Sequence, residues 1–263
     1  MTPTLKFTKT ENKEHWNKFA KNNPNSFFGA SYDKNLVELE NYFIINVLKK
    51  IKPKSLLDIG CGNGYRTKLF SKYVKGKTIG IDYAEKMIKQ AKKIEDSHIS
   101  FELADIWDYK NNQKFDSIVS CRCFINQNSL QKQVKLFQIL RNMTRKNGHL
   151  LLAEASNEGL KRLNKLRGEL GLPPIEEHWF NHHIKENTVF ARINNLYNIN
   201  QIRRLGLFYF TARVIHPSLV WPKKDKKESK VNDAAKEIQL KFFYDDSNFE
   251  DYGRHLLMDL KAK

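Results

Sequence analysis

The chain has 263 residues, 40% hydrophobic and 29% charged, which is enough for one large α/β domain and typical of a globular protein. No apolar run reaches the roughly 20 residues of a membrane-spanning helix, and the first residues lack the apolar core of a signal peptide. Three cysteines are too few for a disulfide framework. We therefore expect a cytoplasmic protein. The formal charge of +17 comes mostly from lysines scattered along the chain, which is compatible with a nucleic-acid partner or with a compositional bias without function.

The first 50 residues are expected to form a peripheral helical region. Apolar residues recur at helical spacing over 36–48, and Pro53 ends this helix. Residues 51–155 then alternate apolar strand-like runs with amphipathic helical stretches. Strands are expected over 55–60, 77–82, 99–105, 115–120 and 148–155. These runs are almost continuously apolar, which suits a parallel sheet buried on both faces, and the alternation predicts a doubly wound sheet.

The alternation breaks at residues 156–188, where we expect a lid made of a helix over 157–171 and a polar aromatic stretch. This segment leaves the fifth strand at its carboxyl end, which is the ligand edge of an open α/β sheet. The closing region 189–263 is expected to hold the rest of a helix over 188–206, a strand over 207–216 and a last strand over 254–262. The whole chain is therefore expected to be one domain.

The stretch LLDIGCGNG, residues 56–64, places Asp58 and then three glycines at alternate positions, ending at Gly64, directly after the first strand. Glycines at this point let backbone N–H groups approach a ligand closely. Two further acids close the next strands, Asp82 in GIDYAEKM and Asp105 in LADIW. Because parallel strands end at the same edge of a sheet, the three acids are expected to meet at one ligand site.

Four motifs in order resemble those of class I S-adenosylmethionine-dependent methyltransferases: LLDIGCGNG, GIDYAEKMI, ADIWD and FDSIVSCRCFIN. The match covers about residues 50–155, and four motifs together are far more specific than a lone glycine loop. The resemblance implies a Rossmann-like, mostly parallel seven-stranded sheet, S-adenosyl-L-methionine as cofactor and methyl transfer as activity. The third glycine comes one residue early for the dinucleotide pattern, which disfavours a nicotinamide dehydrogenase.

Roles for single residues follow from this resemblance. It implies that Asp58 organises the glycine loop, that Asp82 accepts hydrogen bonds from both ribose hydroxyls, and that Asp105 accepts one from the adenine amino group. The alternative is that Asp58 or Asp105 caps a helix and that Tyr83 only packs against its neighbours. The full set of cofactor contacts that the resemblance implies is Asp58, Gly60, Cys61, Gly62, Asp82, Tyr83, Asp105, Ile106, Cys121 and Arg122.

The methyl acceptor is expected to bind under the segments that flank the core. The stretch EEHWFNHH supplies the candidates for catalysis, with a histidine as base: His178, Asn181 and His182. Candidates for acceptor binding are Trp179, His183 and, from the N-terminal region, Tyr32. The alternative is that the stretch only packs a polar lid against the sheet, and Arg122 is a rival group that would hold an anionic acceptor.

A metal site is not expected. His178 and His182 have the spacing of one helical face but no assured third ligand, and the C-x-C of Cys121 and Cys123 has no second pair beside it.

The sequence after the fourth strand, SCRCFIN, differs from the N/D-P-P-Y type that is typical of methylases of nucleobase amino groups. It favours an oxygen, carbon or other small-molecule acceptor. We expect methyl transfer to a small-molecule or glycan acceptor at oxygen, with no membrane partner. Two alternatives stay open: an RNA methyltransferase, suggested by the charge of +17, and a non-catalytic binding module of the same fold.

Overall fold

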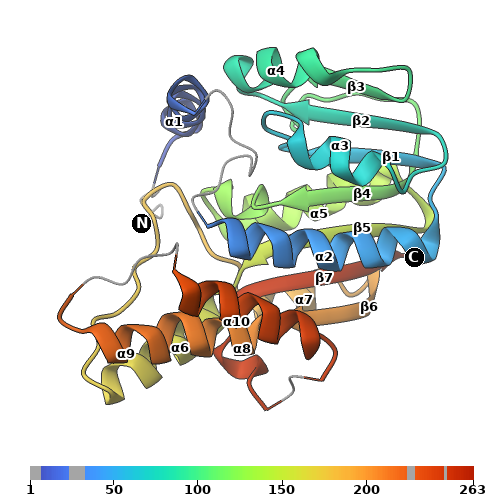
Figure 1. The fold of residues 1–263 in the computed structure, drawn as a ribbon. Coiled ribbons are helices and arrows are strands. Elements are labelled where there is room, and N and C mark those ends of the chain that lie inside the picture. The colour runs from blue at the N-terminus through green and yellow to red at the C-terminus, as the bar shows by residue number, and fades with distance from the viewer. Residues whose placement is uncertain (1–6, 24–32, 224–228, 246–247) are drawn as a thin grey trace, which may run out of the picture.

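The computed structural model describes residues 7–23, 33–223, 229–245 and 248–263. At its centre is one seven-stranded sheet with the strand order β3-β2-β1-β4-β5-β7-β6 (Figure 1). The strands are β1 Ser55–Ile59, β2 Lys77–Asp82, β3 Ile99–Leu103, β4 Phe115–Cys121, β5 Thr144–Ala155, β6 Tyr197–Arg204 and β7 His255–Ala262. β1 to β5 pair in parallel, and β7 is antiparallel to both β5 and β6. The predicted fold class, a doubly wound and mostly parallel seven-stranded sheet, is confirmed.

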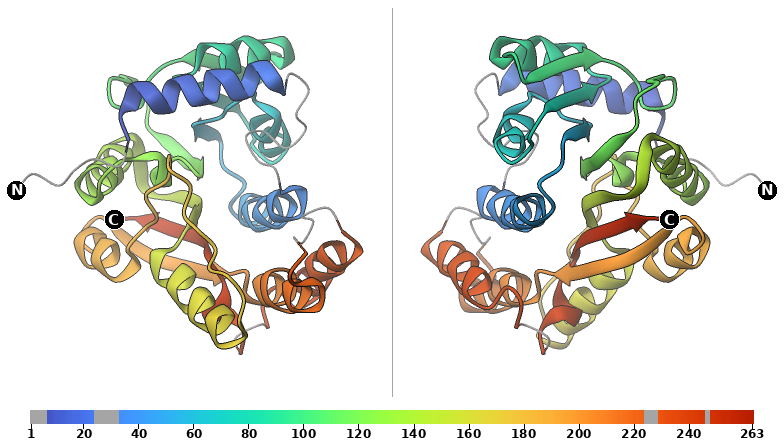
Figure 2. Two further views of the ribbon diagram at one scale, coloured as in Figure 1. Left: turned by 90° about the vertical axis from the view of Figure 1, so that its left-hand side faces the viewer. Right: turned by 90° about the vertical axis from the view of Figure 1, so that its right-hand side faces the viewer.

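Helices cover both faces of the sheet (Figure 2). They are α1 Lys9–Asn22, α2 Lys34–Ile51, α3 Tyr65–Ser71, α4 Glu85–Ala91, α5 Leu130–Met143, α6 Asn157–Glu169, α7 Glu186–Ile193, α8 Gly206–Phe210, α9 His216–Val220 and α10 Lys230–Lys241, with the short turns η1 Lys92–Ile94, η2 Phe124–Asn126, η3 Thr211–Ile215 and η4 Glu250–Tyr252. Several begin at a side chain that accepts a hydrogen bond from the first helical turn, among them Thr8, Asp33, Ser129, Ser156 and Ser229. No described helix combines the length and the apolar character needed to cross a bilayer.

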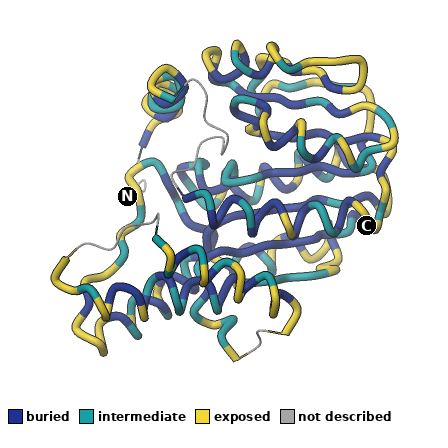
Figure 3. Tube along the Cα trace, viewed as in Figure 1, coloured by how far each residue is buried: buried dark blue, intermediate teal, exposed yellow. Residues whose placement is uncertain are grey.

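The core forms two layers because neighbouring residues of a strand point to opposite faces. Leu57 and Ile118 belong to the apolar cluster that includes residues of α5 and α7. Their neighbours Leu56 and Val119 belong to the cluster that includes residues of α2, α8 and α10. Figure 3 shows the buried strands between these layers. The almost continuous apolar sequence of the central strands follows from this burial on both sides.

The closing region differs from the prediction. The helix expected over 188–206 is wrong beyond α7, because residues 197–204 form β6, an edge strand. The strand expected over 207–216 is also wrong: α8, the π-helical turn η3 and α9 occupy this stretch. An apolar run of this kind fits a buried strand and a buried helix equally well. An edge strand is largely exposed, so β6 lacks the apolar signature that marks the central strands.

Two segments outside the core lie above the carboxyl edge of the sheet. The first is α1, which lies beside α4 (Figure 1). The second, residues 172–185, follows α6 and is tied back to the sheet by a bridge between Ser156 and Ile184. The predicted helix over 157–171 is present as α6. Together with the helices between β6 and β7, these segments surround the space in front of the strands.

Candidate active site

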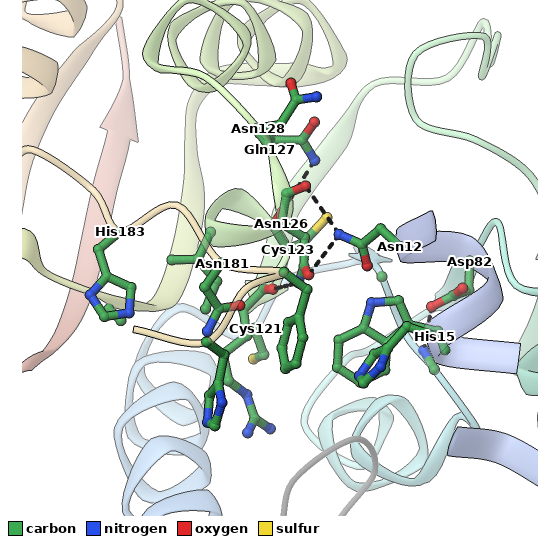
Figure 4. Close-up of a pocket in the computed structure, with 18 of the residues that line it drawn as sticks. Asn12, His15, Asp82, Cys121, Cys123, Asn126, Gln127, Asn128, Asn181 and His183 are labelled. Atoms are coloured by element: carbon green, nitrogen blue, oxygen red, sulfur yellow. Dashed lines mark hydrogen bonds between the residues drawn. The ribbon is translucent and has the colours of Figure 1, made fainter. Parts of the chain in front are cut away.

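A cavity of about 840 Å³ lies at the carboxyl edge of the sheet. Its volume is within the range of small-molecule and cofactor sites. All ten residues that the resemblance implied as cofactor contacts line it: Asp58, Gly60, Cys61, Gly62, Asp82, Tyr83, Asp105, Ile106, Cys121 and Arg122. The structure therefore brings together side chains from four strand ends, as the parallel topology requires. Figure 4 shows Asp82, Cys121 and Cys123 around this space, with Asn181 and His183 approaching from the lid.

The loop after β1 is built from glycines in a left-handed conformation. Gly60, Gly62 and Gly64 have φ angles of 66°, 57° and 78°, which L-residues with a side chain rarely adopt. Gly64 also has no room, since a Cβ atom would lie 2.5 Å from Cζ of Phe101. The glycines thus keep backbone amide groups, rather than side chains, on the wall of the cavity.

Asp82 holds this loop in place. Its Oδ2 accepts a hydrogen bond from the backbone N–H of Gly62 at 2.9 Å, and its Oδ1 accepts from that of Ala84 at 2.8 Å. Burial raises the pKa of Asp82 to about 6, against the opposing effect of these backbone donors. A carboxylate has about four lone-pair positions, so Asp82 can still accept hydrogen bonds from a ligand.

Asp58 is a second buried carboxylate behind the same loop. It accepts a hydrogen bond from Oγ1 of Thr67 in α3 at 2.6 Å. Burial raises the pKa of Asp58 to about 6, although this hydrogen bond and the charge of Arg66 act in the opposite direction. Asp58 thereby joins the end of β1 to the first helix after the loop.

Asp105 follows β3, the neighbour of β2, and lies close to Asp82, whose carbonyl accepts a hydrogen bond from the N–H of Ala104 at 3.0 Å. Asp105 accepts a hydrogen bond from the backbone N–H of Trp107 at 3.0 Å and forms an ion pair with Lys9 of α1. The side chain of Asn12, one turn further along α1, donates to Oδ1 of Asn126 at 3.1 Å (Figure 4). These contacts attach α1 to the cavity wall.

Arg122 follows the end of β4 in a left-handed conformation, with a φ of 63°. A non-glycine residue in this region is strained, and such strain is concentrated at functional sites. The backbone N–H of Arg122 donates to the carbonyl of Ala153 at 2.9 Å, which holds the turn to β5. The next three amides, of Cys123, Phe124 and Ile125, donate to the buried carboxyl of Glu154.

A buried charge cluster centres on Glu40 of α2, which is fully buried. Its carboxylate lies 2.7 Å from Nη1 of Arg66, 2.9 Å from Nε2 of His255 and 3.8 Å from Nη2 of Arg122. Burial alone would raise the pKa of Glu40, but the charges of Arg122 and Arg66 and the contact with His255 hold it well below its usual range. Glu40 is therefore ionised. The other ring nitrogen of His255, Nδ1, lies 2.6 Å from the hydroxyl of Tyr209.

The cavity is also lined by residues from outside the predicted cofactor core. The lid contributes Ile175, Glu176, His178, Phe180, Asn181 and His183, and the closing region contributes Tyr209, Arg213, Arg254 and His255. Phe180 joins the lid to α1, because its ring stacks on His15 at 4.3 Å and on His178 at 5.3 Å. The cavity is thus enclosed by three segments that meet over the sheet edge.

The expected acceptor residues divide into two groups. His178, Asn181 and His183 line the cavity. Trp179 is 48% exposed and packs edge-on against Phe7 and His15 instead. His182 is not among the described residues that line the cavity.

The backbone of His182 ties the lid to the body of the protein. Its N–H donates to the carbonyl of Ile125 at 2.6 Å, and its carbonyl accepts from the side chain of Gln133 at 2.7 Å. Tyr32, the third expected acceptor contact, lies outside the described residues.

Glu40, Arg66, Tyr209, Arg213 and Arg254 escaped the sequence analysis. Glu40 did carry a signal, because residues 36, 40 and 44 lie on one face of a helix and the other two are apolar. A charge on such a face needs a buried partner. Tyr209 and Arg213 were hidden by the wrong assignment of 207–216 to a strand.

Comparison with known proteins identifies the family. A family model described as a methyltransferase domain matches residues 51–213, more than half of the chain. A putative methyltransferase of Invertebrate iridescent virus 6 is 37% identical over 97 residues, 36% of either chain. A malonyl-[acyl-carrier protein] O-methyltransferase of Acetivibrio thermocellus is 37% identical over 90 residues, 33% of this chain and 32% of that protein. The matched part thus spans about a third of these two relatives.

Solved structures share the fold over the whole chain. The N-methyltransferase NodS of Bradyrhizobium japonicum WM9, in complex with S-adenosyl-L-homocysteine, has a TM-score of 0.61 at 14% identity and covers 95% of this chain and 98% of its own. Magnesium protoporphyrin IX methyltransferase of Synechocystis PCC 6803 has a TM-score of 0.62 at 13% identity, covering 97% and 100%. With the four motifs, the strand order and the family model in agreement, the chain belongs to the class I S-adenosylmethionine-dependent methyltransferases of Rossmann-like fold.

Proposed function

We propose that this protein transfers a methyl group from S-adenosylmethionine to an oxygen atom of a small molecule or glycan unit. The observation that carries the proposal is one cavity lined by two sets of residues. One set comes from the family motifs, and the other comes from the lid and the closing region. An acceptor held by the second set would share the cavity with the cofactor. A methyltransferase achieves most of its effect by such alignment.

The residues present fit the cofactor. Gly60 and Gly62 present backbone without a side chain to the cavity, and Asp82 retains lone pairs for the ribose hydroxyls after bonding Gly62 and Ala84. In the proposal Asp105 and the backbone of Ile106 hold the adenine, while Gly60 and Cys121 lie beside the methionine part. The bound cofactor supplies an activated methyl group on a sulfonium, so the chemistry itself is the cofactor's.

The chain's own residues bind and orient the acceptor. We assign acceptor contacts to His178, Asn181 and His183, because these side chains line the cavity. His178 is the candidate base for an acceptor hydroxyl. We assign His182 a supporting role, since its backbone bonds to Ile125 and Gln133 fix the lid. The relative from Acetivibrio thermocellus is a malonyl-[acyl-carrier protein] O-methyltransferase, which supports oxygen as the acceptor atom.

Calorimetry with S-adenosylhomocysteine tests the cofactor half of this proposal. Wild-type protein should bind the ligand, and Asp82→Ala should bind it at least about tenfold more weakly, because two charge-assisted hydrogen bonds are lost. Absence of binding, or undiminished affinity in Asp82→Ala, would refute the proposal. Transfer of a labelled methyl group to a set of small hydroxyl and carboxyl compounds tests the acceptor half. Binding without transfer to any acceptor would favour a non-catalytic module.

An RNA acceptor is the second candidate, and the charge of +17 is the observation that favours it. RNA binding through phosphate contacts weakens steeply with salt. A filter-binding series in increasing salt separates the two proposals. Steeply salt-dependent binding of a structured RNA would support this candidate, whereas weak binding already at low salt would contradict it.

A further inference from the structure

We propose that the acceptor carries an anionic group, a carboxylate or a phosphate, and that Arg254 binds this group with support from Arg122. The inference rests on the proposed function, because it names the class of molecule that shares the cavity with the cofactor as acceptor.

The four arginines that line the cavity differ in how their charges are compensated. Arg66 lies 2.7 Å from the carboxylate of Glu40, and Arg213 is paired with Asp33. Arg122 has only a distant partner, Glu40 at 3.8 Å. Arg254 has no carboxylate partner among the described residues: its side chain interacts with the hydroxyl of Tyr209, and its Nε, like Nε and Nη2 of Arg66, has no hydrogen-bond acceptor there. Arg122 and Arg254 therefore have less opposing negative charge nearby than Arg66 and Arg213.

The carboxylate of Glu40 cannot supply the negative charge that Arg122 and Arg254 lack. Its two oxygens already contact Arg66 and His255 at hydrogen-bonding distance. Arg122 and Arg254 are partly buried, and a cation that is partly withdrawn from water is stabilised by a paired anion. A bound anion would supply the missing partner. Guanidinium is also the side-chain group best suited to it, because its planar fork matches carboxylate and phosphate.

Arg254 is fixed in place from two sides. Its backbone carbonyl accepts a hydrogen bond from the N–H of Ser156 at 2.8 Å, at the junction of β5 and α6. Its guanidinium carbon lies 5.7 Å from the ring centre of Tyr209, within the range of a cation–π contact. The ring of Tyr209 is held in turn by the 2.6 Å contact of its hydroxyl with His255. The group is thus oriented before a ligand arrives, which lowers the entropy cost of binding.

The proposed anion site is also connected to the residues that the family motif assigns to the cofactor. Arg122 directly follows Cys121, which the family motif puts beside the methionine part of the cofactor. Glu40 contacts both Arg122 and His255, and His255 follows Arg254 in the chain. The same buried carboxylate therefore links Arg122 to His255, the first residue of β7, which directly follows Arg254. An acceptor held by its anionic group at Arg254 would extend towards the methyl donor.

The test uses the full chain saturated with S-adenosylhomocysteine, titrated by calorimetry with succinate, inorganic phosphate and the neutral analogue succinamide. We expect succinate or phosphate to bind with a dissociation constant on the order of millimolar, and succinamide not to bind. Preference between the two anions identifies the carboxylate or the phosphate class. Arg254→Gln should weaken anion binding at least about tenfold, and Arg254→Lys should weaken it less.

Arg192→Gln is the matched control, because Arg192 is exposed on α7 and the substitution removes the same charge. It should leave anion binding unchanged. Equal effects of Arg254→Gln and Arg192→Gln, or no binding of either anion, would overturn the inference. If Arg254→Gln fails to fold, the comparison of succinate with succinamide on wild-type protein and on Arg254→Lys decides. Failure of the wild type to bind S-adenosylhomocysteine would refute the proposed function instead.

Discussion

The carboxylate of Glu40 lies 2.9 Å from Nε2 of His255, although 215 positions separate them in the chain (255 − 40). The contact joins α2, which precedes the sheet, to β7, its last strand. The same carboxylate pairs with Arg66, so one buried negative charge organises three elements around the cavity.

The first prediction is that Glu40→Gln destabilises the protein by about 3 kcal/mol, because removing one partner of a buried ion pair leaves uncompensated charge. Urea denaturation followed by circular dichroism measures the change. Glu38→Gln is the matched control on the same helix: Glu38 is 43% exposed and pairs with Lys236, so its loss should cost less than about 1 kcal/mol. Equal losses of stability in both variants would contradict the prediction that the buried cluster around Glu40 stabilises the protein more than an exposed ion pair does.

The second prediction concerns the glycine loop. Gly64→Ala should cost about 2–4 kcal/mol and weaken binding of S-adenosylhomocysteine, because the new Cβ meets Phe101 at 2.5 Å at a φ of 78°. Gly168→Ala provides the contrast, since Gly168 lies within α6 and a Cβ there meets nothing within 4 Å. It should stabilise the protein by about 0.5–1 kcal/mol. Equal stability of the two variants contradicts the geometry of the loop.

The third prediction is that ligand binding releases protons near pH 6. Burial raises the pKa of Asp82 to about 6, and hydrogen bonds from ribose hydroxyls would favour its charged form and lower that pKa. Calorimetric titration of S-adenosylhomocysteine at pH 6, in two buffers of different ionisation enthalpy, measures the release. Asp82→Asn should reduce the number of protons released and the affinity together. Equal proton release in wild type and variant would exclude Asp82 as the source.

The fourth prediction concerns stability without ligand. The folded pKa values of Asp58 and Asp82, each about 6, lie above the ordinary value of 3.8. Protonation therefore favours the folded state: the stability that these two groups contribute is fully present below a pH of about 4 and is lost as the pH rises through about 6. In Asp58→Asn, the loss of stability between pH 4 and pH 7 should be smaller than in the wild type. Urea midpoints across this range provide the measurement, and an unchanged pH dependence would contradict the raised pKa of Asp58.

The fifth prediction concerns the lid. Asn181→Ala should lower turnover at least about tenfold while leaving the affinity for S-adenosylhomocysteine within about twofold, because Asn181 is assigned to the acceptor. His182→Ala should have a smaller effect, since the backbone bonds of residue 182 persist in the variant. Lys185→Ala is the control, because Lys185 is exposed at the end of the segment 172–185 and does not line the cavity. If Asn181→Ala loses cofactor affinity and keeps its turnover, the assignment is wrong.

The sequence predicts the part of the site that is formed by residues at the ends of parallel strands. Asp58, Asp82 and Asp105 each end or follow a strand, and parallel topology brings strand ends together, so their meeting was predictable. Glu40, Tyr209 and Arg254 meet only through tertiary packing of segments far apart in the chain. No spacing rule connects them. The edge strand β6 was missed for a related reason: its pattern is polar because one side is exposed, and the apolar run after it fits helix and strand alike.

The helices between β6 and β7 have a consequence for how this enzyme could be changed. They supply Tyr209 and Arg213 to the cavity, and Arg254 and His255 complete that side. None of the four family motifs lies in this part of the chain. In our proposal this stretch shares acceptor recognition with the lid, so exchanging residues 156–188 and 205–254 together for the equivalent stretches of a relative should change the acceptor and keep S-adenosylmethionine as the methyl donor.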